Sequence, residues 1–323
     1  MMKMNKNNYM MQNIVTICFC ALLFLAGCNR KPSKFTDETP TRGNVKVGVD
    51  ESFKLLLDTE IFTFQSIYTD AKVTPIYKPE LGILDDFMKD SVRFIVTTRN
   101  LTKNEDEYLR SKQIIPRTTK IAYDALALIV NAKNADSLIQ YTKVRDIFLS
   151  KITNWKQISS KSQSNGISVV FDNEKSGNVR YFVEKFNLPN KLPKNFYAVN
   201  KNEDVINYVE NHENAIGIIS VNWVSDKHDS ISHSFLKRIK VVAITSEFDP
   251  EGPDYYRPYQ GFIADKSYPF IRDVYIINRE IFSGLGSGLL AFIAGDKGQR
   301  IILKSKLVPA TMPVRLIQIK NSI

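Results

Sequence analysis

The sequence of 323 residues contains few of the side chains that build metal sites and covalent catalytic sites. There are three cysteines and three histidines, and the histidines do not follow the spacing of known metal-binding motifs. The chain also lacks a G-x-S-x-G elbow and a Walker phosphate loop. From these absences we expect no metal, no cofactor and no enzymatic activity.

Long hydrophobic runs are absent as well. The longest apolar stretch, residues 14–26, has about 13 residues, whereas a membrane-spanning helix needs about 20. It follows Lys3 and Lys6, and a basic segment before a short apolar one is typical of a secretory signal peptide. The stretch ends in Leu25-Ala26-Gly27-Cys28, which resembles the lipobox of bacterial lipoproteins, in which the cysteine is acylated.

The lipobox resemblance divides the N-terminal region. It predicts a lipoprotein signal peptide at residues 1–27, a lipid on Cys28 and a flexible polar tether over residues 28–43. The alternative is an ordinary signal peptide with a coincidental cysteine. Since Cys18 and Cys20 fall in the removed segment, no disulfide is expected. We therefore expect a protein of the cell envelope, lipid-anchored to a membrane and facing the periplasm or the exterior.

The charge is basic but dispersed. The formal net charge is +10, and no block of like charge occurs along the chain. Dispersed lysine and arginine residues indicate a solvated surface that mildly favours anions. A nucleic-acid role fits poorly with export, so no nucleic-acid partner is expected.

From residue 45 onward, strand-like and helix-like patterns alternate. Residues 45–49 alternate as a strand does, and the apolar residues between Phe53 and Phe64 recur at helical spacing. Further strands are expected at 73–77, 94–98, 121–131, 167–171, 216–220, 240–244 and 274–278, and further helices at 81–88, after the Thr102–Glu105 capping box, and at 142–149, 202–211 and 289–303. This alternation is typical of an α/β fold with mostly parallel sheets.

Polar residues follow three of the predicted strands at the points where helices begin. The first junction contains Asp50 and Ser52, the second Thr97, Thr98 and Arg99, and the third Asp172, Ser176, Gly177 and Asn178. In open α/β sheets, ligands bind beyond the carboxyl ends of the strands, where helix N-termini present free N–H groups. Hydroxyl and guanidinium groups bind oxyanions. The three junctions together predict an anion-binding cleft, although helix capping would explain each one alone.

Several motifs resemble those of the phosphate-binding proteins of ABC transporters, which have the type II periplasmic-binding-protein fold. Residues 124–131 resemble the hinge strand of that family, and residues 144–155 resemble a segment that ends in a tryptophan. Ser176-Gly177-Asn178 stands where the family has Ser-Gly-Thr. The other matching residues are Ala215-Ile216-Gly217-Ile218, Tyr268, Pro269, Arg272, Gly298 and Gln299.

The resemblance implies a two-lobed α/β fold with the ligand cleft between the lobes. Lobe one would comprise residues 44–120 plus 247–323, and lobe two residues 121–246. The residues carried over to ligand binding are Ser52, Phe53, Thr98, Ser176, Gly177 and Asn178.

Two departures from the family pattern concern the ligand. The family's hydroxyl-rich loop after the second strand is replaced by residues 77–82, so one contact is expected to be missing. Arg99 and Asp172 carry charges opposite to those of well-known members. We expect Arg99 to bind the phosphate oxygens from lobe one and Asp172 to accept the phosphate proton from lobe two. The alternative is that both are solvated and that Lys175 or Arg180 holds the anion.

The function implied by the resemblance is that of a solute-binding lipoprotein. It would capture inorganic phosphate and deliver it to the permease subunits of an ABC transporter. A first alternative is a lipoprotein of the same fold that acts as an anion sensor or interaction module without transport. A second alternative, an enzyme such as a phosphatase, is disfavoured because no metal set and no nucleophile set is visible in the sequence.

Overall fold

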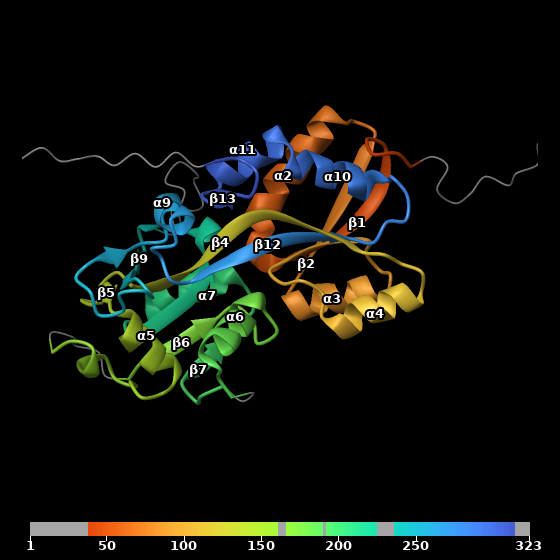
Figure 1. Ribbon diagram of the computed structural model, residues 1–323. Helices are drawn as coiled ribbons and strands as arrows, with labels where there is room; N and C mark the ends of the chain where they lie inside the picture. Colours follow the sequence, from red (N-terminus) through yellow and green to blue (C-terminus); the bar gives the residue numbers. More distant parts are fainter. Residues whose placement is uncertain (1–37, 161–165, 190–191, 225–235, 314–323) are drawn as a thin grey trace, which may run out of the picture. The chain divides into compact units, whose positions relative to one another are not determined.

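The computed structural model describes residues 38–160, 166–189, 192–224 and 236–313 (Figure 1). The predicted signal peptide, Cys28 and most of the predicted tether lie outside these ranges. Within them, we find no helix that is both long and apolar enough to cross a membrane. The fold is built on one large mixed sheet with helices beside it (Figure 1).

Within the described ranges, ten strands form the large sheet. Its order is β2 (Ala71–Lys78), β1 (Gly43–Asp50), β3 (Phe94–Thr97), β12 (Ile271–Asn278), β4 (Arg117–Asn131), β8 (Ala215–Ser220), β6 (Ser168–Phe171) and β7 (Phe196–Ala198), while β13 (Val308–Pro309) and β9 (Ile239–Val241) also pair with β4. Strands β2, β1 and β3 are parallel, as are β8, β6 and β7, and the central β12 and β4 are antiparallel to their neighbours. The predicted parallel pairing is therefore confirmed at both ends of the sheet.

The long strand β4 joins the two ends. Residues 117–125 pair with β12, and residues 126–130 pair with β8. From Ile121 to Asn131 nearly every side chain is buried, because both faces of the strand are covered. The strand predicted at 121–131 is confirmed, since β4 contains all of these residues. We call the elements around β1–β3 lobe one and those around β6–β8 lobe two, and the predicted lobe boundaries stay a prediction.

Helices accompany both ends of the sheet (Figure 1). Beside β1–β3 are α2 (Lys54–Ile67), α3 (Glu80–Met88), α4 (Lys103–Ser111), α10 (Leu285–Ala294) and α11 (Asp296–Lys304), and in the rest of the described chain are α5 (Tyr141–Phe148), α6 (Gly177–Phe186), α7 (Asn202–Asn211) and α9 (Gln260–Ala264). Short 3₁₀ helices span Glu51–Phe53, Trp155–Gln157 and Val221–Trp223, and a small sheet contains β11 (Tyr255–Tyr256), β10 (Ala243–Thr245) and β5 (Leu138–Ile139). The predicted helices 81–88, 142–149 and 202–211 are confirmed to within one residue at each end, and the capping box of α4 is formed.

Two sequence predictions of single elements are wrong. The expected helix at 289–303 is divided at Gly295, which ends α10 and precedes α11. The second helix folds back so tightly that a Cβ on Gly298 would lie 2.4 Å from the Cα of Ile293. The expected strand at 240–244 is two strands, because Ile239–Val241 pair with β4, whereas Ala243 and Ile244 pair with β5.

An aromatic core fixes the position of α6. Phe182 of this helix stacks on Phe148 with ring centroids 4.3 Å apart and meets Phe270 edge-on at 5.0 Å. All three rings are buried, and burial of each stabilises the fold by about 1.5–3 kcal/mol. The N-terminus of α6 is thereby held at the end of β6, where it faces lobe one.

Candidate ligand-binding site

The carboxyl ends of β1 and β6 lead into capped helix starts. Asp50 is the last residue of β1, and its Oδ1 accepts a hydrogen bond from the backbone N–H of Ser52 (2.9 Å). Ser176 precedes α6, and its Oγ accepts a hydrogen bond from the backbone N–H of Val179 (3.3 Å). The capping predicted at these two junctions is confirmed. Each cap satisfies one N–H group and leaves the others of the first turn available to a ligand.

Predicted site residues of the two lobes meet in one buried cluster. The Oγ of Ser52 donates to the Oδ1 of Asn178 (3.4 Å), and the Nδ2 of Asn178 donates to the Oδ1 of Asp172 (3.0 Å). Gly177 lies so close to lobe one that a Cβ would be 2.7 Å from the Oγ1 of Thr98. Only glycine permits this approach. The structure therefore brings residues of all three junctions together.

Arg99 does not join this cluster. Its Nη1 and Nη2 each donate to a carboxylate oxygen of Glu105 at 2.8 Å, and Nη1 also donates to the carbonyl of Asn100. Glu105 is at the same time the acidic partner of the Thr102 capping box. The expected facing pair of Arg99 and Asp172 is not formed, because a carboxylate six residues along the chain binds both arms of the guanidinium.

A different arginine reaches across the cleft. Arg180 of α6 donates from Nε to the Oε2 of Glu80 (2.6 Å) and from Nη2 to the Oγ1 of Thr98 (2.9 Å). Arg180 is the alternative cation that the sequence offered, whereas Glu80 was missed. The only sequence signal for Glu80 is an acidic residue directly after Pro79 at a helix start. Acidic residues are common in the first helical turn, so this signal does not point to a site.

Arg272 of β12 is the second cation of the site. Its Nε donates to the Oδ2 of Asp124 on the neighbouring strand (2.9 Å), and its Cζ lies 5.5 Å from the ring centroid of Phe53. The Nη1 and Nη2 atoms are buried and have no hydrogen-bond partner among the described residues. Unpaired buried donors on a charged group are costly, so these two atoms favour an acceptor from a ligand. The sequence contained Arg272 in a family-like pattern but gave it no role.

Asp50 supplies an unpaired acceptor beside this arginine. Its Oδ2 is buried without a hydrogen-bond partner among the described residues. Burial, and next the negative charge of Glu80, raise the pKa of Asp50 to about 7, while the charge of Arg272 opposes this rise. The ring of Phe53, which follows Asp50 closely in the chain, lies 5.5 Å from the Cζ of Arg272, and this places both side chains in one site. An acceptor and two donors are thus unused in the same site.

The other carboxyls of the cleft differ in protonation. Burial raises the pKa of Asp172 to about 6 and that of Glu51 to about 6. Burial alone would also raise the pKa of Glu80, but the hydrogen bonds and charge of Arg180 outweigh it and lower this pKa to about 2. Glu80 is therefore ionised at neutral pH, whereas Asp172 and Glu51 take up protons in mildly acidic solution.

Further contacts across the cleft converge on the start of lobe one's first helix. The Nδ2 of Asn222 and the Nε1 of Trp223 donate to the carbonyl of Ser52 at 3.1 and 2.9 Å. Asn202 donates to Glu51 from both its backbone N–H and its side chain. Sequence reasoning did not single out these lobe-two residues, since none of them follows a local anion-binding pattern. They hold lobe two against lobe one.

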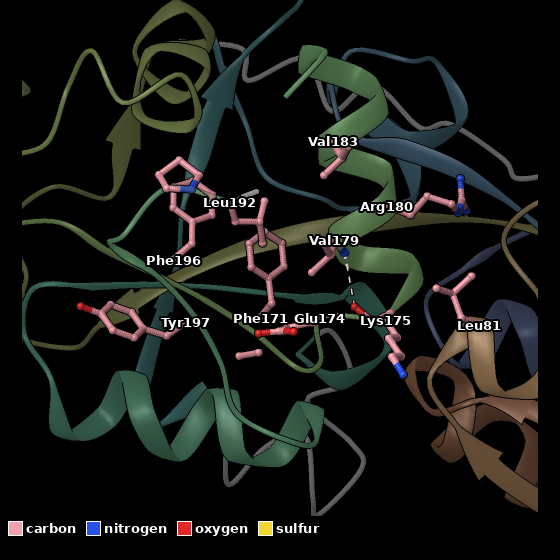
Figure 2. A pocket seen from close by; sticks show the side chains of 13 residues that line it. Leu81, Phe171, Glu174, Lys175, Val179, Arg180, Val183, Leu192, Phe196 and Tyr197 are labelled. Atoms are coloured by element: carbon pink, nitrogen blue, oxygen red, sulfur yellow. Dashed lines mark hydrogen bonds between the residues drawn. The ribbon is translucent and has the colours of Figure 1, made fainter. Parts of the chain in front are cut away.

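A pocket of about 670 Å³ opens beside α6 (Figure 2). Its apolar wall contains Phe171, Val179, Val183, Leu192 and Phe196. Its other end contains Lys175, Ser176 and Arg180 together with Leu81 of α3, and Figure 2 shows Arg180 directed toward the side of Leu81. The pocket therefore reaches the cleft where Arg180 binds Glu80.

The donor set of the cleft suits an oxyanion. Two arginines, hydroxyl groups and the N-terminus of α6 are the groups that bind phosphate-like and carboxylate ligands in proteins. In the part of the chain that the structure describes, no group of three or more histidine, cysteine, aspartate or glutamate side chains is arranged to hold a metal ion.

Two lobes joined by long central strands, with capped helix starts facing one another, define a solute-binding protein of the type II periplasmic-binding-protein class. A family model described as "PBP superfamily domain" matches residues 36–297. The chain belongs to this family, which makes it a solute-binding protein rather than an enzyme.

The individual relatives have low sequence identity to this chain. The chain is 23% identical over 240 residues to the "Phosphate-binding protein PstS" of Staphylococcus aureus (strain USA300), which covers 72% of this chain and 68% of the relative. Among solved structures, it is similar to a Clostridium perfringens protein with bound phosphate, with a TM-score of 0.68 and 22% identity over 83% of this chain and 99% of the other. An ABC-type phosphate transport receptor from Vibrio cholerae has a TM-score of 0.61 and 19% identity, with 83% and 100% covered.

Proposed function

We propose that this protein is an extracytoplasmic lipoprotein that captures inorganic phosphate and delivers it to the permease of an ABC transporter. One observation carries the proposal: among the described residues, the buried Nη1 and Nη2 of Arg272 have no acceptor, and the buried Oδ2 of Asp50 in the same cleft has no donor. Protonated phosphate offers oxygens to the first and a hydroxyl to the second. The phosphate-binding relatives support the same ligand.

In this proposal Arg272 has the role that the sequence suggested for Arg99. Arg272 binds phosphate oxygens with Nη1 and Nη2, because Asp124 binds its Nε and no other described residue accepts from these two atoms. The N-terminus of α6 contributes backbone N–H groups and the positive end of the helix dipole. The ligand contacts carried over from the family are Ser52, Phe53, Thr98, Ser176, Gly177 and Asn178, with Asp172 beside them.

Capture requires the lobes to separate and close again. The central strands β4 and β12 are the natural hinge, since β4 pairs with both ends of the sheet. A closed, loaded cleft would present to the permease a surface that the open protein lacks. The lipid predicted on Cys28 would keep the protein at the membrane, and stable attachment would need more than one acyl chain.

Isothermal titration tests the ligand. The purified protein is first freed of bound phosphate by unfolding, dialysis and refolding. We expect one site per chain with a dissociation constant of about 1 µM or below, which is about −8.2 kcal/mol. Phosphate at 100 times this constant would stabilise the fold by about 2.7 kcal/mol. Absence of both heat and stabilisation would rule out phosphate capture.

Reconstitution tests delivery. The lipoprotein and an ABC phosphate permease are placed in proteoliposomes, and ATP hydrolysis is measured with and without phosphate. Delivery predicts hydrolysis that needs both the lipoprotein and phosphate. Phosphate binding without any effect on hydrolysis would favour the alternative of an anion sensor.

A further inference from the structure

The carboxylate of Glu80 is bound as an anionic ligand would be. Its Oε1 accepts hydrogen bonds from the Oγ1 of Thr97 (3.0 Å) and from the backbone N–H and Oγ1 of Thr98 (3.0 and 2.6 Å). Arg180 donates to both oxygens, from Nε at 2.6 Å and from Nη2 at 3.2 Å. A backbone N–H, two hydroxyls and a guanidinium thus surround one buried carboxylate, which is a complete oxyanion site.

The bonds to Glu80 come from both lobes. In lobe one, Thr97 ends β3, Thr98 follows it and Glu80 begins α3. Arg180 lies on α6 in lobe two. Directly beside this ion pair, the backbone N–H of Leu81 donates to the carbonyl of Lys175 (3.2 Å). The Glu80–Arg180 pair is therefore a link across the cleft, and it is almost fully buried on the Glu80 side.

Glu80 leaves no space for a second anion at Thr98. A Cβ on Gly177 would lie 3.0 Å from the Oε1 of Glu80 and 2.7 Å from the Oγ1 of Thr98, so the helix N-terminus already touches the carboxylate. An external oxyanion can use Thr98 and Arg180 only after the Glu80 side chain has moved. The pocket in Figure 2 adjoins Arg180 and offers room on that side.

We propose that Glu80 is an internal anion that occupies the oxyanion subsite of Thr98 and Arg180, holds the lobes together without ligand, and must be displaced by phosphate. This inference rests on the proposed function for the identity of the competing anion. The consequence is a lower affinity for phosphate. Phosphate binds only those molecules in which Glu80 has moved away, and the observed affinity is reduced by their fraction.

Glu80→Gln is the decisive variant. Glutamine keeps the shape of the side chain and loses the charge that holds Arg180, so the internal anion becomes a weak competitor. We expect phosphate to bind about ten-fold tighter than to the parent, as the freed guanidinium pairs with the ligand. Arg180→Gln breaks the same ion pair but removes the ligand's partner, and we expect it to bind phosphate about ten-fold more weakly.

Glu184→Gln is the matched control. Glu184 also binds Arg180, through Nη1 at 2.8 Å, but it lies on the same helix and its side chain is largely exposed. Its removal leaves the link across the cleft intact, so the phosphate affinity should stay within about two-fold of the parent. Should Glu80→Gln not fold, Glu80→Asp draws the carboxylate away from Thr98 and serves the same comparison.

Opening of the ligand-free protein is measured independently by small-angle scattering. Glu80→Gln should increase the radius of gyration without phosphate, and Glu184→Gln should not. If phosphate binds the folded Glu80→Gln variant equally or more weakly than the parent, Glu80 is only a structural partner and the inference is overturned. If no variant binds phosphate but Glu80→Gln still opens, the internal link stands and the proposed ligand fails. An unchanged radius of gyration overturns the link as well.

Discussion

Arg272 and Asp124 form a buried ion pair between two antiparallel strands. They are register partners in β12 and β4, and the Nε of Arg272 lies 2.9 Å from the Oδ2 of Asp124. Both side chains are almost fully buried, with 3% and 0% of their surface exposed, so packing restricts their movement. This pair therefore fixes the guanidinium by its Nε, whereas its Nη1 and Nη2 have no partner in the part of the chain that the structure describes.

Arg272→Lys should weaken phosphate binding by about 1.5–3 kcal/mol, because lysine keeps the charge but cannot both pair with Asp124 and fork onto two oxygens. The matched variant is Arg99→Lys, whose parent side chain is bound to Glu105, and its effect should stay below about 0.5 kcal/mol. Titration calorimetry gives both values. If Arg99→Lys weakened phosphate binding more than Arg272→Lys does, Arg99 would be the cation that binds the ligand.

Phosphate affinity should fall as the pH rises above about 7. The pKa of Asp50 is about 7 in the protein without ligand, so the carboxyl loses its proton between pH 6 and pH 8. An anionic ligand beside it keeps a proton in the site, so the complex holds more protons than the free protein, and binding loses up to about ten-fold per pH unit. In the Asp50→Asn variant, the pH dependence of the phosphate affinity should come from the titration of phosphate alone. Equal pH slopes in parent and variant would exclude Asp50 as the linked group.

Asp50 should also reject sulfate. At pH 8, about one unit above the pKa of about 7 that Asp50 has without ligand, the carboxyl is mostly ionised. Phosphate still carries a proton at this pH and sulfate does not, so the carboxylate accepts a hydrogen bond from phosphate but meets only lone pairs and negative charge on sulfate. Asp50→Asn should improve sulfate binding relative to phosphate by about 1–3 kcal/mol. Asp172→Asn should have less effect, because Asn178 already donates to that carboxylate. Competition titrations with sulfate and phosphate measure both effects. If Asp172→Asn improved sulfate binding and Asp50→Asn did not, this would support the role first expected of Asp172.

The difference between Arg99 and Arg272 shows how far sequence reasoning reached. The junctions at Asp50 and Ser176 were predictable because a strand, a capping residue and a helix follow one another within a few residues. Arg272 lies within a strand, and its partner Asp124 is 148 residues away in the sequence. No local pattern reports such a pair. Arg99 was favoured by its charge, by the two hydroxyls that precede it at a strand end and by its position in the family pattern, although the nearby Glu105 was already visible as part of a capping box.

Glu80 was hidden for a different reason. Its local sequence is that of an ordinary acidic residue in the first turn of a helix. Its bonds to Thr98 and Arg180 depend on the packing of α3 beside β3 and on closure of the cleft, which bring Glu80 together with residues 18 and 100 positions away. The family resemblance only indicated that a hydroxyl-rich loop was missing near residues 77–82, and the structure has a carboxylate there.

Cys28→Ala should abolish lipid attachment and leave unprocessed precursor, if the cysteine is the acylated residue of a lipobox. Cys20→Ala is the matched control, because Cys20 lies in the predicted hydrophobic segment and should not be acylated. Metabolic labelling with a fatty acid and the mass of the product give the readout. Labelled, processed Cys28→Ala protein would contradict the lipobox.

Glu60 should destabilise the fold more as the pH rises. This residue of α2 is fully buried, and neither carboxyl oxygen has a hydrogen-bond partner among the described residues. Burial raises its pKa to about 9, above the ordinary value of 4.5 expected in the unfolded chain. The folded protein therefore holds a proton that the unfolded chain releases. The free energy of unfolding is therefore not reduced by Glu60 ionisation below pH 4.5, and it falls progressively as the pH rises to about 9.

Glu60→Met removes the titrating group and keeps a long helix-forming side chain. We expect a gain of about 1–3 kcal/mol in the free energy of unfolding at pH 7, since a buried unsatisfied polar group disappears. The gain should grow between pH 5 and pH 8 by at most about 1.4 kcal/mol per unit. Urea unfolding at pH 5, 6.5 and 8 measures it. Glu107→Met on the exposed face of α4 should show no such trend, and a pH-independent gain for Glu60→Met would mean that Glu60 is not protonated in the folded protein.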